Sequence, residues 1–223
     1  FNNEPTIKWM DVVNETILPN GKWFGPKKGT DKWENPWLKM GLDENGYPLY
    51  ILKAFEIATK HATNIKLVYN QNAGMQTEMW NKLKETIVYI RSKGYRVDGI
   101  GWQAHIGLSP TTEALKENTD VALKKLSKLI DWAHQNDLEF HVTELDYFIQ
   151  DKSKLNEGLK SQAAFYQKLI NVLQKKTKSG VVTLNLWDIG ERTKKGKEGA
   201  FQSIYDSKFQ PNPSYNIIKN INK

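Results

Sequence analysis

The sequence predicts an α/β fold built on a parallel sheet, and three observations lead to this class. Short β-rich runs alternate with longer amphipathic stretches along the whole chain of 223 residues. This alternation is typical of parallel strands joined by right-handed helical crossovers. Polar and ionisable residues gather where the expected strands end, and no Gly-x-Gly-x-x-Gly follows the first strand, which argues against a dinucleotide-binding sheet.

Five strands and five helices are expected in strict alternation. The strands are short β-rich runs at residues 7–13, 65–69, 99–103, 139–142 and 181–186. The helices show the three- and four-residue apolar spacing and lie at 50–63, 78–93, 120–136, 160–178 and 214–222. Gly94 follows the second helix as a C-terminal cap. Since no internal repeat or low-complexity linker interrupts the chain, residues 1–223 are expected to form one domain.

Composition excludes several classes of protein. Hydrophobic residues make up 39% and charged residues 26%, as in an ordinary soluble globular protein. No apolar run approaches the roughly 18 residues that cross a bilayer, and residues 1–4 show no signal peptide. The absence of cysteine excludes disulfides, thiolate metal sites and cysteine nucleophiles. The net charge of +7 is scattered along helices and loops, which favours a solvated basic surface over a nucleic-acid site.

Aromatic residues gather in one polar, loop-like stretch that contains Trp23, Phe24, Trp33 and Trp37. Tryptophans on a polar loop are typical of surfaces that stack on flat apolar ligands, of which sugar rings are the commonest. The same residues could equally pack against one another as a small core inside the loop. Both interpretations stay open.

The strand ends carry the groups that chemistry needs. Polar runs occupy 11–15, 69–72, 102–105, 143–146 and 185–188, and in a (β/α)₈ barrel the C-terminal strand ends build the active site. Glu15 and Glu144 stand at the ends of different strands, and glycoside hydrolysis requires two carboxyl groups, one as acid and one facing the anomeric carbon. Lone carboxylates at strand ends also serve as ion-pair partners or helix caps, so spacing alone leaves the choice open.

Five segments resemble family 10 of the glycoside hydrolases, in the order that the family shows. Residues 9–15, Trp-Met-Asp-Val-Val-Asn-Glu, resemble its acid/base strand, W-D-V-V-N-E. Residues 98–105 resemble its D-G-I-G-x-Q-x-H strand, and residues 141–146 resemble its T-E-L-D nucleophile strand. Asn185-Leu186-Trp187 and residues 209–215 resemble the last strand and the closing segment. The resemblance covers nearly the whole chain.

The resemblance implies a (β/α)₈ barrel, of which this chain supplies roughly the last five β/α units, and a retaining endo-1,4-β-xylanase. Glu15 would be the acid/base and Glu144 the nucleophile. His105 would orient Glu144, and Asp146 would hold His105. The residues that would bind substrate are, together with His105, Asn14, Tyr69, Asn70, Gln103, Trp187 and Arg192. No metal or organic cofactor is implied.

The sequence departs from the family pattern in three places. No counterpart of the first three strands precedes Phe1, so the missing N-terminal part of the same polypeptide is an expected partner, as in members with a carbohydrate-binding insertion. The loop from Thr16 to Tyr47 is long and rich in tryptophan. The family's second tryptophan after the last strand has no match, and either Arg192 or Phe201 could fill its place.

Two other functions stay open beside the xylanase. One is a non-catalytic carbohydrate-binding protein that keeps the aromatic surface. The other is a related retaining β-glycanase, a cellulase or mannanase. For the xylanase, the expected partners are xylan and xylo-oligosaccharides, and nucleic acid is not expected as a partner. No membrane-spanning segment is expected. The protein is expected to be secreted, periplasmic or on the cell surface.

Overall fold

The chain folds into two compact units. The computed structural model describes residues 4–25, 35–193 and 199–221. The N-terminal unit consists of Phe1–Gln71, Gln76–Gly101 and Asp137–Glu139, and the C-terminal unit of Asn72–Met75, Trp102–Asn136 and Phe140–Lys223. The single domain over residues 1–223 stays a prediction.

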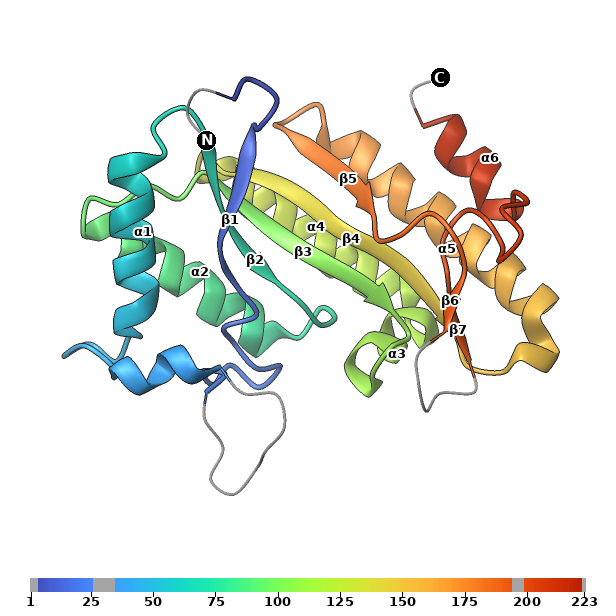
Figure 1. Ribbon diagram of the computed structural model, residues 1–223, viewed down its shortest axis with the longest axis horizontal. Helices are drawn as coiled ribbons and strands as arrows, with labels where there is room; N and C mark the ends of the chain where they lie inside the picture. Colours follow the sequence, from blue (N-terminus) through green and yellow to red (C-terminus); the bar gives the residue numbers. More distant parts are fainter. Residues whose placement is uncertain (1–3, 26–34, 194–198, 222–223) are drawn as a thin grey trace. The chain divides into compact units, whose positions relative to one another are not determined.

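The N-terminal unit places two helices beside a parallel strand pair (Figure 1). Its elements are β1 (Trp9–Asn14), the 3₁₀ turn η1 (Pro36–Met40), α1 (Leu49–His61), β2 (Lys66–Gln71) and α2 (Thr77–Ser92). β1 and β2 pair in parallel, and the last pair joins Asn14 to Asn70. Because parallel strands end at the same edge, the polar residues that follow β1 lie beside those that end β2.

Apolar spacing explains why the two helices of this unit form and which side they bury. In α1, Ile51, Phe55 and Ala58 recur at four- and three-residue intervals and are buried. In α2 the buried apolar positions are Met79, Trp80, Leu83, Ile87 and Ile90. Gly94 has φ 82°, and its N–H bonds to the Arg91 carbonyl at 2.9 Å, so the predicted C-terminal cap is confirmed.

The C-terminal unit continues the sheet and covers it with longer helices. Its elements are the later part of β3 (Gly99–Ile106), α3 (Pro110–Glu117), α4 (Thr119–Gln135), β4 (Glu139–Ile149), the 3₁₀ turn η2 (Lys152–Lys154), α5 (Leu155–Lys176), β5 (Val182–Leu186), β6 (Arg192–Thr193), β7 (Ala200–Gln202) and α6 (Pro213–Lys219). The strand order is β1-β2-β3-β4-β7-β6, and β5 pairs with β4 in parallel. Figure 1 shows α5 and α6 lying along this unit.

All ten predicted elements are present, and the differences lie at their boundaries and in the connections. β4 runs to Ile149, seven residues beyond the predicted end, because it pairs first with β5 and then, antiparallel, with β7. The short helix α3 was not predicted. It begins after Ser109, whose backbone N–H bonds to the Thr112 hydroxyl at 2.9 Å in a capping box.

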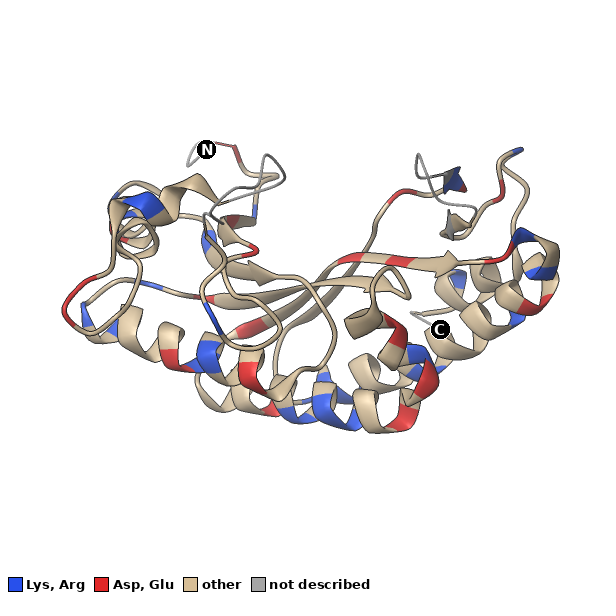
Figure 2. Cartoon of the chain, turned by 90° about the horizontal axis from the view of Figure 1, so that it is seen from below, with Lys and Arg blue, Asp and Glu red and all other residues tan. Residues whose placement is uncertain are grey.

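The surface of the described residues is charged and mixed. Figure 2 shows Lys and Arg interspersed with Asp and Glu along the helices of both units. Within the described parts of the chain, no helix combines the length and the apolar character that a bilayer crossing requires.

The structure confirms packing within the tryptophan-rich stretch at Trp23, and stacking on a sugar ring stays a prediction. The Trp23 indole N–H donates to the Gly46 carbonyl at 2.9 Å, and its ring meets Tyr47 edge-on at 6.1 Å, so Trp23 packs inside the loop. Trp37, on η1, is 65% exposed. Trp33 lies outside the described residues.

Candidate active site

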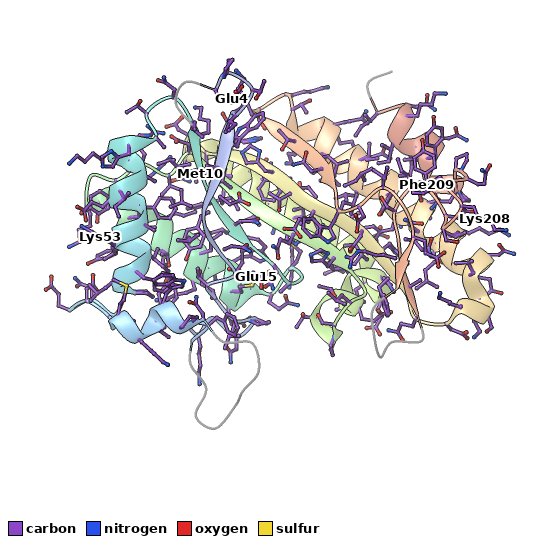
Figure 3. All side chains as sticks on the ribbon, in the orientation of Figure 1. Glu4, Met10, Glu15, Lys53, Lys208 and Phe209 are labelled. Atoms are coloured by element: carbon purple, nitrogen blue, oxygen red, sulfur yellow. The ribbon has the colours of Figure 1, made fainter. Side chains whose placement is uncertain are left out.

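Glu15 stands directly beyond β1 in a backbone conformation that is unusual for its residue type (Figure 3). Its φ is 53°, in the left-handed region that residues with a Cβ seldom adopt. Its N–H donates to the Asn70 carbonyl at 3.3 Å, so the neighbouring strand holds this turn. Strained residues of this kind concentrate at functional sites.

Buried polar side chains of β2 hold the segment that follows Glu15. The Gln71 amide accepts from the Thr16 N–H at 3.1 Å and donates to the Ile17 carbonyl at 2.6 Å. The hydroxyls of Thr16 and Tyr69 lie 2.5 Å apart. Neither Gln71 nor Thr16 was predicted as a site residue. Gln71 lies in the polar run at the end of its strand, and this position was the sequence feature that could have identified it.

Tyr69 and Asn70 were expected to bind substrate; both are buried, and their contact with substrate stays a prediction. Tyr69 is 0% and Asn70 1% exposed. Burial also raises the pKa of the Tyr69 hydroxyl far above its usual range. The Asn70 amide donates to the Asp11 carboxylate at 3.1 Å, within the N-terminal unit. Both residues hold the turn at Glu15, through the Tyr69 hydroxyl beside Thr16 and the Asn70 carbonyl that accepts from the Glu15 N–H.

A largely apolar cavity of 660 Å³ opens beside Glu15 in the N-terminal unit. Its volume falls within the range of small-molecule sites. Figure 3 labels Glu15 at the end of β1 and Lys53 on α1, which both line it. The other lining residues are Val12, Val13, Asn14, Phe24, Asn35, Pro36, Trp37, Met40, Tyr50, Ala54 and Ile57.

In the C-terminal unit, Glu144 is held by side chains from β3. Its Oε1 accepts from the Gln103 amide at 2.8 Å, and its Oε2 lies 3.0 Å from His105 Nε2. Gln103 and His105 are two residues apart on β3, and so are Glu144 and Asp146 on β4, so each pair lies on one face of its strand. Gln103 was expected to contact substrate or the acid/base, and the structure gives it the predicted nucleophile as a partner.

His105 links two carboxylates. Its Nδ1 lies 3.0 Å from Asp146 Oδ1, and its Nε2 is on Glu144. Burial opposes a charge on His105, but hydrogen bonds to Asp146 and Glu144 outweigh it and raise the pKa to about 9. At neutral pH the ring is therefore an imidazolium that donates to both carboxylates.

The segment after β5 surrounds this imidazolium. Trp187 meets the His105 ring edge-on at 6.1 Å and is 44% exposed, so it offers surface beside Glu144. Arg192 Nη2 donates to Asp146 Oδ2 at 2.7 Å, and its Nε lies 3.0 Å from Asp188 Oδ2. The Arg192 contact with Asp146 was not predicted. The Phe201 side chain, the other candidate for the missing tryptophan, lies outside the described residues.

The structure thus groups the predicted residues by unit. Asn14, Glu15, Tyr69 and Asn70 lie at the strand ends of the N-terminal unit, and Gln103, His105, Glu144, Asp146, Trp187 and Arg192 lie together in the C-terminal unit. Among the residues that the structure describes, no cluster of three or more His, Asp or Glu could hold a metal ion. Glu144 pairs with His105, and Asp146 pairs with both His105 and Arg192.

Known proteins resemble this chain along its length. "Endo-1,4-beta-xylanase A" of Thermoanaerobacterium saccharolyticum is 29% identical over 220 residues, which cover 96% of this chain and 16% of that protein. "Exoglucanase XynX" of Acetivibrio thermocellus is 29% identical over 225 residues, covering 98% of this chain and 18% of that protein. This chain therefore spans less than a fifth of these two relatives.

Among solved structures, xylanase 10B of Thermotoga petrophila RKU-1, in complex with xylobiose, has a TM-score of 0.75 and 23% identity. The match covers 98% of this chain and 60% of that one, and it confirms the predicted partial (β/α)₈ barrel with five parallel strands. The family model of glycosyl hydrolase family 10 matches residues 3–221. From β1 to the segment that follows β5, the chain belongs to glycosyl hydrolase family 10.

Proposed function

We propose that this chain carries both catalytic carboxylates of a retaining endo-1,4-β-xylanase. The observation that carries the proposal is the row of Glu144, His105 and Asp146, in which each ring nitrogen of His105 lies 3.0 Å from one carboxylate. A nucleophile that attacks an anomeric carbon must be ionised and held in place, and this arrangement favours both conditions. Family membership and relatives named xylanases support xylan as the substrate.

In the first step, Glu15 gives its proton to the glycosidic oxygen while the bond from that oxygen to the anomeric carbon breaks. A Glu144 oxygen forms an ester bond to the same carbon, and the shortened xylan chain leaves as an alcohol. Glu15 ends this step as a carboxylate.

In the second step, Glu15 takes a proton from water. The water oxygen bonds to the anomeric carbon, the ester breaks, and Glu144 returns as a carboxylate. Two successive inversions leave the β-configuration unchanged. His105 acts in both steps, because its N–H on Glu144 steadies the carboxylate before attack and after release.

Two further residues complete the proposed sugar site. Asn14 is exposed at the end of β1 and would hydrogen-bond the sugar 2-hydroxyl. Trp187 exposes 44% of its surface beside His105 and would form an apolar floor for the sugar ring. The Gln103 amide on Glu144 Oε1 would fix the second oxygen of the nucleophile.

The β-glycanase alternative has one observation in its favour. A relative that matches 98% of this chain is named an exoglucanase, so a glucan is a second candidate substrate. Xylose lacks the hydroxymethyl group of glucose, so relative activity on xylan and cellulose-derived oligosaccharides distinguishes the two. A higher kcat/KM on the glucose oligomers than on xylan would identify a glucan as the substrate in place of xylan.

We propose that the rest of the polypeptide supplies the strands that close the barrel. A closed barrel of this class has eight strands, and this chain provides five parallel ones. The match to the solved xylanase 10B covers 60% of that chain, which leaves room for the remainder. The proposed location of the protein is secreted, periplasmic or on the cell surface, where polymeric xylan is accessible. Cell fractionation followed by immunoblotting tests that location.

The test is reducing-sugar release from xylan by the full polypeptide that the gene encodes, together with its E144A variant. Hydrolysis by the wild type and none by the variant would support the proposal. Proton NMR of the first product formed should detect the β-anomer before mutarotation. An α-anomer would contradict the double displacement, and inactivity of the wild type would contradict the xylanase.

A further inference from the structure

Arg192 has contacts that the resemblance to the family did not indicate. Its Nη2 lies 2.7 Å from Asp146 Oδ2, and its Nε lies 3.0 Å from Asp188 Oδ2. The Asp146 side chain is 1% exposed, whereas that of Arg192 is 34% exposed. The arginine thus reaches from the surface to a buried carboxylate that is itself hydrogen-bonded to His105.

We propose that Arg192 is a positioning residue, which fixes the nucleophile Glu144 through Asp146 and His105 rather than binding sugar. The inference rests on the proposed function, because it assigns a role in the same double displacement.

Charge balance is the first argument. Glu144, His105 and Asp146 together carry two negative charges and one positive charge, and Arg192 adds a second positive charge beside the buried Asp146, while the other carboxylate at Arg192, Asp188, is mostly exposed. A buried carboxylate is strongly destabilised without a cationic partner. Without Arg192, Asp146 would depend on His105 alone and would compete with Glu144 for the same imidazolium.

Geometry is the second argument. Asp146 divides its oxygens, with Oδ1 on His105 and Oδ2 on Arg192, so the plane of the carboxylate is fixed from both ends. That plane sets the orientation of the His105 ring, whose other nitrogen lies on Glu144 Oε2. An arginine fork suits this task, since its planar donors match carboxylates in direction.

The surrounding segment supports the same role. Asp188 and Arg192 are four residues apart, and Trp187 next to them meets the His105 ring. The guanidinium donates one hydrogen bond to the Asp146 carboxylate, and its Nε lies at ion-pair distance from Asp188, so its protein contacts are those of a structural link. The segment from 187 to 192 therefore places both a sugar-facing ring and a brace for the nucleophile around His105.

The experiment isolates the attack by Glu144. A xylobioside with fluorine at C2 of the reacting sugar and a dinitrophenolate leaving group esterifies the nucleophile without needing the acid Glu15. Mass spectrometry measures the fraction of enzyme trapped over time. The dependence of the observed trapping rate on reagent concentration gives the maximal trapping rate and the dissociation constant of the reagent separately. The full polypeptide is used throughout.

For R192M we expect a trapping rate about tenfold lower or more, because small displacements of a nucleophile cost rate steeply. The dissociation constant should stay within about twofold, since the sugar contacts are unchanged. The matched control is K176M, which removes a lysine that pairs with Asp131 at 2.6 Å between α4 and α5 of the same unit. It should trap at the wild-type rate.

R192K keeps the charge but not the fork, and it serves if R192M does not fold. We expect about a threefold lower trapping rate with an unchanged dissociation constant. If a folded R192M or R192K variant is trapped at the wild-type rate, or if only the dissociation constant of the reagent rises, the proposed role of Arg192 is overturned. If the wild-type enzyme itself is not trapped at Glu144, the proposed function fails, and the inference fails with it.

Discussion

At the scale of single residues, the proposed mechanism gives Glu144 and Glu15 different chemistry, so the two should respond differently to substitution. For E144A we expect kcat to fall by about a thousandfold or more on every xyloside, because no covalent intermediate can form. The measurement is release of dinitrophenolate from an activated xylobioside. Circular dichroism checks the fold, and substantial turnover by folded E144A would contradict the role of Glu144.

E15A should distinguish substrates by their leaving groups. On xylan, loss of the general acid is expected to lower the rate about a hundredfold to ten-thousandfold. On an activated xylobioside the glycosylation step should be far less affected, since dinitrophenolate leaves without a proton. The two substrates are compared in steady-state kinetics with the same preparation. Equal losses on both would contradict the assignment of Glu15 as acid.

His105 connects protonation to stability. Its pKa is raised from 6.5 to about 9, so the folded state holds the proton more tightly than the unfolded state. This contribution is complete below pH 6.5 and is lost as the pH rises through 9. We expect the free energy of unfolding to fall over this range by roughly 3 kcal/mol at most. Urea unfolding of wild type and H105Q measures it, and parallel pH curves would contradict the expectation.

Sequence identified the charged residues better than their partners. The spacing within residues 103–105 and 144–146 already indicates a shared face, because side chains alternate along a strand. The Arg192–Asp146 contact could not be predicted, since it joins residues 46 positions apart and the turn that leads from β5 to Arg192 has no regular period. Tyr69 was assigned to substrate from the resemblance to the family, and a strand buried along nearly its whole length gives no alternation that would show the direction of its side chain.

At the scale of elements, α5 packs closely against the end of β4 at Gly158. A Cβ on this residue would lie 2.7 Å from the Ile149 Cδ1 atom. Helix propensity alone would make G158A stabilising by about 1 kcal/mol, whereas overpacking would make it destabilising by about 1–3 kcal/mol. We expect the overpacking to dominate, because Ile149 is only 5% exposed and has little room to move.

A double-mutant cycle with I149A checks the cause of that change. Removing the Ile149 side chain should make the added methyl of G158A harmless, so the two substitutions should be non-additive in urea unfolding. If the changes in the free energy of unfolding are additive, the destabilisation of G158A does not come from its contact with Ile149.

The elements that sequence predicted well are those with a regular apolar period, such as α2 and α4. The boundary of β4 was missed because Thr143, Glu144 and Asp146 interrupt the apolar run, while pairing with β5 and β7 keeps the backbone extended. The helix α3 was missed because its eight residues are too few to establish a period. Strand pairing sets the end of β4, and the capping box sets the start of α3; neither shows as a regular period in the sequence.

At the scale of the whole molecule, the N-terminal unit exposes apolar surface beside its cavity. Trp37 is 65% and Ile57 49% exposed, and both line the cavity of 660 Å³. Surface of this kind is typical of a docking face or of an aggregation site. We expect the 223-residue chain alone to bind a hydrophobic dye and to self-associate in sedimentation velocity, and the full polypeptide to do neither. A monomeric, cooperatively unfolding 223-residue species would contradict the proposed completion of the barrel.

The left-handed backbone of Glu15 has a consequence for the evolution of this position as well as for its chemistry. Glycine adopts a φ of 53° without a steric penalty, whereas a residue with a Cβ loses about 1 kcal/mol there. A single base change converts a glutamate codon to a glycine codon, so one mutational step would relieve the strain and delete the proposed acid. Under the proposed function, selection for hydrolysis opposes that step, and the gain in stability favours it wherever that selection is absent.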